Sequence, residues 1–326
     1  MSKATARILI RNLESNQTRL DFAGFLAEEL KQGDVQKLRT AREFFSEASY
    51  GEWTAQRDYP SIPPVQGDSC GFGSIPSDVE DLLLLLRLYR PGDLAFVGLN
   101  IEKDGKRHKQ YPYRAISSLV GLSTRQFQFQ ENDCQPWTSF QSELKGYPAW
   151  KSSWFDVARR FFLYGGGKEF KPYFPGEVDR IVDYFASLEA VLVPEKDFLA
   201  RRIRERAMRL LDLANEEAKE TKKLLTDFYD VRSAIVHGSE LSDKRMSWLQ
   251  DRQRWWCFEE RVRGVLIAAL RQVPDENPAR QSYLAKRYDV SDEEKARKIV
   301  QDFNSIRSES KRRDLREGLK DATYVR

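Results

Sequence analysis

His237 and Arg232 are the residues of this sequence whose types and spacing could do chemistry. His237 is one of only two histidines among 326 residues, and Arg232 stands five positions before it in the segment DFYDVRSAIVHGSEL. A histidine can give or take a proton near neutral pH, because its unperturbed pKa is about 6.5. An arginine binds a carboxylate or a phosphate through a planar fork of N–H donors. The pair therefore offers proton transfer beside an anion-binding group.

The element that carries both residues is predicted to be a helix that ends at His237. Gly238 is a favoured residue just beyond a helix end, so His237 falls in the last turn, where the helix dipole favours a cation. Basic residues are common there, so a structural histidine remains the alternative. Five residues of α-helix turn about 500° and rise roughly 7.5 Å, so Arg232 and His237 point about 140° apart. Ser233, four residues before His237, shares its face of the helix.

Arg232 and His237 point in different directions from one helix. A site that uses both residues is therefore more easily formed by two copies of the chain. A twofold interface presents every residue twice. Two copies of the helix could then line one cleft with two histidines and two arginines. A chemical role for His237 therefore predicts a homodimer.

The second half of the chain has the periodicity of packed helices. Apolar residues recur at steps of three and four over residues 178–193 and 198–214, in a third segment that ends at His237, and over residues 242–272. Four amphipathic helices with short connections predict an antiparallel bundle. One more helix is expected at 292–306 in a highly charged tail.

This arrangement resembles the HEPN superfamily, and in particular its Apea-like branch. The resemblance lies in SLEAVLVPEKD, RRIRERAMRLL and DFYDVRSAIVHG, in which an arginine, four residues and His-Gly end the third helix. It covers residues 178–273, and LRLYRPGDLAFVGLN looks more weakly like the N-terminal region of such proteins. Ser233 follows Arg232 where many catalytic members have Asn, Asp or His. Many HEPN domains bind RNA or protein partners without cleaving.

The resemblance implies a metal-independent ribonuclease whose active site forms at a dimer interface, with no cofactor. His237 would act as general base on a ribose 2′-hydroxyl, and its twofold mate would protonate the leaving 5′-oxygen. Arg232 would bind the scissile phosphate and stabilise its transition state. Ser233 would orient His237. Glu189 matches a position that is often acidic in this branch, and an exposed helical carboxylate is the alternative for it.

A basic run precedes the candidate site and predicts contact with RNA phosphates. The segment KDFLARRIRERAMR holds six basic and two acidic residues, so its excess of +4 equals the formal net charge of the whole chain. Arg202, Arg206 and Arg209 follow at steps of four and three, which makes a stripe along one helix. Phosphate contacts of this kind supply affinity without sequence choice. A solvated face paired with Glu205 and Asp212 is the alternative.

Other residue types offer less chemistry. Trp255 and Trp256 could stack on bases, although Trp255 belongs to the apolar stripe of its helix and core packing is expected. His108 is expected on an exposed edge strand. Two distant histidines do not make a metal site, and neither do three scattered cysteines, which are Cys70, Cys134 and Cys257.

The first half of the chain reads as mixed α and β. We expect a strand at residues 6–12 and a helix opened by a capping box of Ser77 and Glu80. Pro91-Gly92 should end that helix, and a hairpin should turn at Asp104-Gly105. The triplet Gly165-Gly166-Gly167 lacks the other residues of a phosphate-binding loop. It is therefore interpreted as a hinge between domains.

These features predict an α+β protein with three parts. A mixed α/β domain with a sensing or regulatory role, whose ligand is unknown, covers residues 1–166. A HEPN-like bundle covers 167–275, and a charged helical tail covers 276–326. Apolar residues make up 40% and charged residues 32%, and neither a signal peptide nor a membrane span is expected, which favours a cytoplasmic protein. The predicted function is RNA cleavage by an antiviral-defence or toxin effector, with a non-catalytic RNA-binding or protein-interaction module as the alternative.

Overall fold

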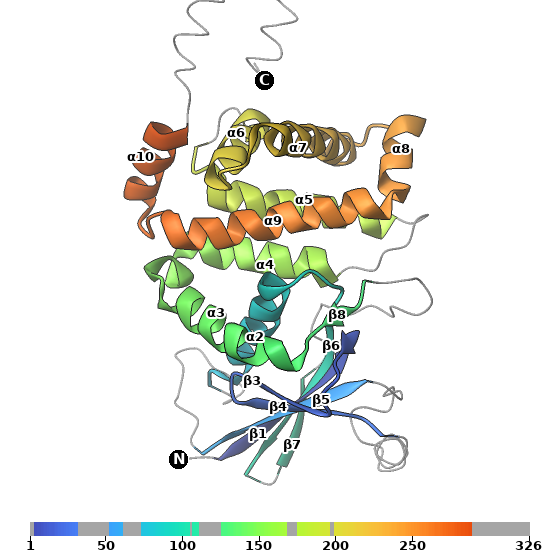
Figure 1. Ribbon diagram of the computed structural model, residues 1–326, viewed down its shortest axis with the longest axis vertical. Coiled ribbons are helices and arrows are strands. Elements are labelled where there is room, and N and C mark those ends of the chain that lie inside the picture. The colour runs from blue at the N-terminus through green and yellow to red at the C-terminus, as the bar shows by residue number, and fades with distance from the viewer. Residues whose placement is uncertain are drawn as a thin grey trace, which may run out of the picture.

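The fold combines an N-terminal antiparallel sheet with a C-terminal stack of helices, which confirms the α+β class (Figure 1). Helix α2 (Ile75–Tyr89) lies between the two parts, and α3 (Cys134–Gly146) and α4 (Ser153–Gly167) lead from the sheet to the remaining helices. The computed structural model describes residues 3–31, 52–60, 73–104, 106–110, 125–167, 175–195 and 199–288.

The sheet has six antiparallel strands in the order β3-β4-β5-β1-β6-β7. Strand β1 is central and buries Ala4, Ala6, Ile8 and Ile10. It includes most of the strand predicted at residues 6–12. A separate short pair, β2 and β8, runs parallel. The strands are β1 (Ala4–Arg11), β2 (Leu13–Glu14), β3 (Arg19–Phe22), β4 (Phe25–Glu29), β5 (Trp53–Tyr59), β6 (Ala95–Lys103), β7 (Lys106–Gln110) and β8 (Phe127–Gln128).

The predicted hairpin is present, because β6 and β7 pair antiparallel. Ile101 pairs with His108, so this histidine stands on the edge strand of the sheet, as expected. Asp104 has φ +49°, a left-handed turn conformation that aspartate tolerates better than most residues. Gly105 lies outside the described residues.

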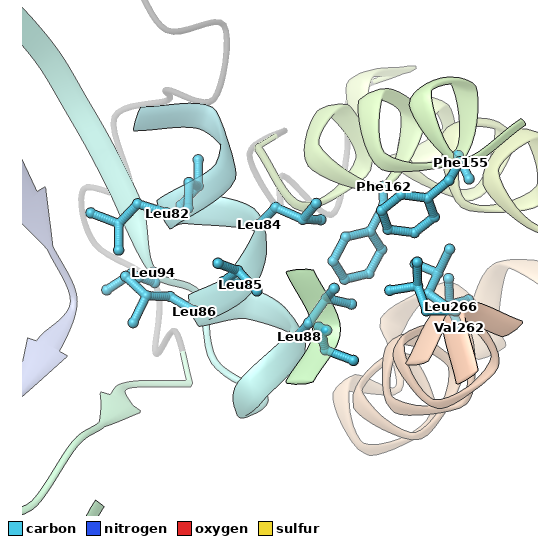
Figure 2. Packing of buried hydrophobic residues seen from close by; sticks show 14 of the residues in the cluster. Leu82, Leu84, Leu85, Leu86, Leu88, Leu94, Phe155, Phe162, Val262 and Leu266 are labelled. Carbon is cyan, nitrogen blue, oxygen red and sulfur yellow. The ribbon is translucent and has the colours of Figure 1, made fainter. Parts of the chain in front are cut away.

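From Leu82 to Leu86 helix α2 is apolar on all sides, because this part of the helix is covered on all sides. Its run of five leucines is buried. Figure 2 shows Leu82 and Leu86 on the side of the strands, whereas Leu88 faces Phe162 and Val262 of the helical part. Helix α2 contacts α3, α4 and α9 (Arg252–Gln272). One apolar core therefore runs from the sheet through α2 into the helices.

The start of α2 corrects the predicted capping box. The helix begins at Ile75, after Ser74, with a proline in its first turn, and no side-chain hydrogen bond caps it. Ser77 and Glu80 therefore lie inside the helix. Proline is well suited to a first turn, since its missing N–H has no partner there in any case. The end at Tyr89, just before Pro91-Gly92, agrees with the prediction.

The glycine triplet is not a hinge, because α4 continues through Gly167. A Cβ atom on Gly165 would lie 2.8 Å from ring carbons of Tyr184, which is closer than atoms can pack. Tyr184 belongs to α5 (Pro175–Leu192), so glycine at 165 lets α4 and α5 approach closely. At Gly165 the absence of a side chain therefore serves close packing of two helices.

The helices expected in the second half are present, with changes at their ends. Helix α6 stops at Leu210, and Asp212 takes a φ of +50°. The long helix expected at 242–272 is two helices, because Asp251 ends one and caps the next with a bond from the Arg254 N–H to its carboxylate. The expected helix at 292–306 lies outside the described residues. The remaining helices are α6 (Leu199–Leu210), α7 (Asn215–Val236), α8 (Asp243–Gln250) and α10 (Asn277–Tyr288).

Four of these helices pack together, since each of α5, α6, α7 and α9 contacts the other three. Phe228 and Phe258 stack at their centre, parallel at 4.4 Å between ring centroids, and Phe185 lies tilted against Phe258 at 5.3 Å. No helix in the described part of the chain has the length and apolar character needed to cross a membrane.

Candidate functional site

The C-terminus of α7 is closed by its own backbone. His237 is the C-cap, and Gly238 follows with φ +66°. The Gly238 N–H donates to the Ile235 carbonyl at 3.0 Å, and the Ser239 N–H donates to the Ala234 carbonyl at 2.8 Å. This pair of bonds is a Schellman motif, and it satisfies carbonyls that a helix end leaves without partners. The helix end predicted at His237 is therefore confirmed, and its closure needs no side chain.

The side chain of His237 is exposed to solvent. Val236 beside it is also exposed, and it is one of two large apolar residues that stand out from the described surface. Because the backbone turn completes the helix end, the imidazole is free of a capping role. A solvated imidazole at a helix terminus can take part in proton transfer.

Arg232, by contrast, is held in place. Its Nη2 donates to Glu189 Oε1 at 3.0 Å, and its guanidinium lies 5.5 Å from the ring centroid of Tyr229. The Nε is buried and has no hydrogen-bond partner among the described residues. The contact with Glu189 thus leaves one donor of the guanidinium unsatisfied.

Glu189, on α5, completes an ion pair between two helices. Burial raises the pKa of its carboxyl group, and the positive charge of Arg232 opposes that shift only in part. Ionisation of this carboxyl group costs desolvation, and the ion pair with Arg232 offsets part of that cost. Glu189 is therefore not the exposed helical carboxylate that was the alternative for it.

Ser233 does not orient His237 in this structure. Its side chain is half-buried, and its backbone carbonyl accepts the His237 N–H at 3.1 Å. Among the described residues no hydrogen bond joins the Ser233 hydroxyl to the His237 ring. The shared helix face that the spacing predicted is therefore not used for a hydrogen bond between these side chains.

The arginines expected to form a phosphate track do not form an exposed stripe. Arg206 is fully buried, and its guanidinium binds Glu195 at 2.8 Å and 3.1 Å and the Leu192 carbonyl at 2.6 Å. Arg202 also pairs with Glu195, at 3.3 Å. Arg209 is exposed but donates to the Tyr288 carbonyl. The spacing was read correctly, but it places Arg206 on the face of α6 that packs against α5.

The C-terminus of α5 is completed by buried arginines, a feature that the sequence did not indicate. Arg280 of α10 is buried and donates to the carbonyls of Ala190 and Val191. With Arg206 on the Leu192 carbonyl, two cations from different helices complete the C-terminus of α5. Neither contact could be read from the sequence, because the partners are 89 and 14 residues apart. This arrangement fixes the backbone beside Glu189.

The remaining candidates lie elsewhere. Trp255 is buried, and its Nε1 donates to the Leu249 carbonyl, so it packs in the core as expected. Trp256 is half-buried, and Arg125 lies over its ring. His108 belongs to the sheet. In the described part of the chain, no three histidine, cysteine or acidic residues lie together as a metal site.

No model of a protein family, no curated protein and no solved structure matches this chain.

Proposed function

We propose that this protein is a metal-independent endoribonuclease of the HEPN type, with α5, α6, α7 and α9 as its four-helix bundle. The observation that carries the proposal is the end of α7. An exposed histidine stands there beyond a helix terminus that backbone bonds already complete, and Arg232 precedes it on the same helix. A basic residue that the fold does not need is available for chemistry.

In the proposed reaction, two chains contribute to one site. His237 of one chain takes the proton of a ribose 2′-hydroxyl, and the 2′-oxygen forms a bond to the adjacent phosphorus. The bond to the 5′-oxygen breaks, and the partner subunit's His237 returns a proton to that oxygen. Arg232 binds the phosphate oxygens while negative charge develops on them. The products are a 2′,3′-cyclic phosphate and a 5′-hydroxyl.

Two observations favour a second function, a HEPN module that binds RNA or a protein without cutting. Arg232 already has an anionic partner in Glu189, and Ser233 makes no bond to His237. In that case His237 would be an exposed helix end without a chemical role. Either function suits a defence or toxin effector whose N-terminal half senses or restrains it.

Cleavage of a mixed RNA pool in excess EDTA separates these functions. The proposed enzyme cuts under these conditions, and purified His237→Ala does not, although it folds. Light scattering should report a dimer at micromolar concentration. Equal cleavage by both proteins, or cleavage that requires added Mg²⁺, would exclude the proposed mechanism. Binding of RNA without cleavage by a dimeric or monomeric protein would favour the second function.

A further inference from the structure

The Glu189 carboxylate occupies a donor of Arg232 that a phosphate would use. Arg232 Nη2 is 3.0 Å from Glu189 Oε1. Carboxylate and phosphate oxygens bind the N–H groups of a guanidinium in the same planar geometry. A phosphate that approaches Arg232 therefore meets an occupied donor and a negative charge beside it.

The pair is enclosed enough for that charge to matter. The side chains of Arg232 and Glu189 keep only 18% and 23% of their exposure, so water screens them weakly. Burial raises the pKa of Glu189, and in the described part of the chain Arg232 is the cation that opposes this. A carboxylate held by one N–H donor against a desolvation cost can be displaced. A phosphodiester can offer two oxygens to the same guanidinium and so can replace it.

Displacement would involve the side chain of Glu189 alone. The three residues that follow it have their carbonyls bound by Arg280 and Arg206, both buried. The Glu189 carbonyl itself accepts the Val193 N–H at 3.0 Å. The backbone that carries Glu189 is thus fixed, and rotation of its side chain is the available movement.

We propose that Glu189 is an internal competitor of the RNA phosphate for Arg232. The inference rests on the proposed function, since it assumes that Arg232 binds phosphate. While the site is empty, Glu189 neutralises Arg232 and weakens its attraction for isolated anions. A strand with several phosphate contacts supplies enough affinity to displace the carboxylate, so the site selects polynucleotides over inorganic phosphate and mononucleotides.

The test measures binding of a short mixed-sequence RNA whose riboses carry 2′-O-methyl groups, which prevents attack by the 2′-oxygen. Fluorescence anisotropy compares wild type with Glu189→Gln, Glu189→Ala and Arg232→Ala. Glu205→Gln is the matched control, because Glu205 pairs with Arg201 at 3.1 Å and these side chains keep 24% and 17% of their exposure. Glu189→Gln and Glu205→Gln each remove one negative charge from a partly buried ion pair between arginine and glutamate. Thermal unfolding verifies that each variant folds.

We expect Glu189→Gln to bind this RNA about tenfold more tightly, which corresponds to about 1.4 kcal/mol. Glu189→Ala should also bind more tightly, and Glu205→Gln should stay within about twofold of wild type. The gain should disappear in the double variant with Arg232→Ala. Weaker binding by Glu189→Ala, with wild-type binding by Glu189→Gln, would mean that Glu189 positions Arg232 and would overturn the inference. Unchanged binding by Arg232→Ala would instead contradict the proposed function on which it rests.

Discussion

The C-termini of α5 and α7 are completed in different ways. At α5, the carbonyls of residues 190–192 accept hydrogen bonds from Arg280 and Arg206, and both guanidiniums are buried. At α7, backbone N–H groups close the end, and His237 remains in solvent. A cation that completes a buried helix end is part of the fold. A basic side chain beside an end that the backbone has completed is available for binding or catalysis.

The largest change in stability is expected when a cation is removed from the C-terminus of α5. Arg206→Ala should lower the free energy of unfolding by about 3 kcal/mol, because it leaves the Leu192 carbonyl without its buried donor and Glu195 with Arg202 as its remaining partner. Chemical denaturation measures the change. The control is Arg209→Ala, which removes one hydrogen bond from an exposed side chain and should cost about 1 kcal/mol. Equal losses would mean that burial does not distinguish the two arginines.

A smaller effect is expected at the α7 end, where the backbone turn does the capping. Gly238 has φ +66°, and a Cβ atom there would meet nothing within 4 Å. Gly238→Ala should therefore cost about 1 to 2 kcal/mol through backbone strain alone. Gly238→Asn should cost less, since asparagine tolerates the left-handed region. Alanine and asparagine variants of equal stability would contradict a role for backbone strain.

The ion pair of Glu189 should make stability depend on pH. Its pKa is raised in the folded protein, so the folded state holds the proton more tightly than the unfolded state. The stability of wild type relative to Glu189→Gln should thus be greatest in acid and fall as the pH rises through the raised pKa. At neutral pH we expect the glutamine variant to be at least as stable as wild type. Thermal unfolding from acidic to neutral pH measures this, and the opposite slope would show that Arg232 outweighs burial.

The smallest effect on stability is expected for His237 itself. His237→Ala removes an exposed side chain without a capping role, so the free energy of unfolding should change by less than about 0.5 kcal/mol. Cleavage of RNA should nevertheless be lost. A large loss of stability, with cleavage retained in the folded fraction, would return His237 to a structural role.

The sequence predicted the elements of the fold better than their boundaries. Helical periodicity located α5, α6 and α7, and Gly238 located the end of α7, because these signals act between near neighbours. The break at Asp251 and the early start of α2 were missed. At Asp251 apolar periodicity continues past a local cap, and at α2 the helix begins before the predicted cap, so the pattern alone does not show where a helix begins or ends.

What the sequence determined by itself was therefore local: an α+β chain, packed helices, and an arginine and a histidine at the end of one of them. Only the tertiary structure decided which basic residues are available. Arg206 and Arg209 belong to one run of similar residues, yet one is buried against Glu195 and the other is exposed. Glu189 lies 43 residues from Arg232 and pairs with it across two helices. Periodicity defines faces on a helix, whereas the partner that covers each face, and the charge it brings, depends on how the helices pack.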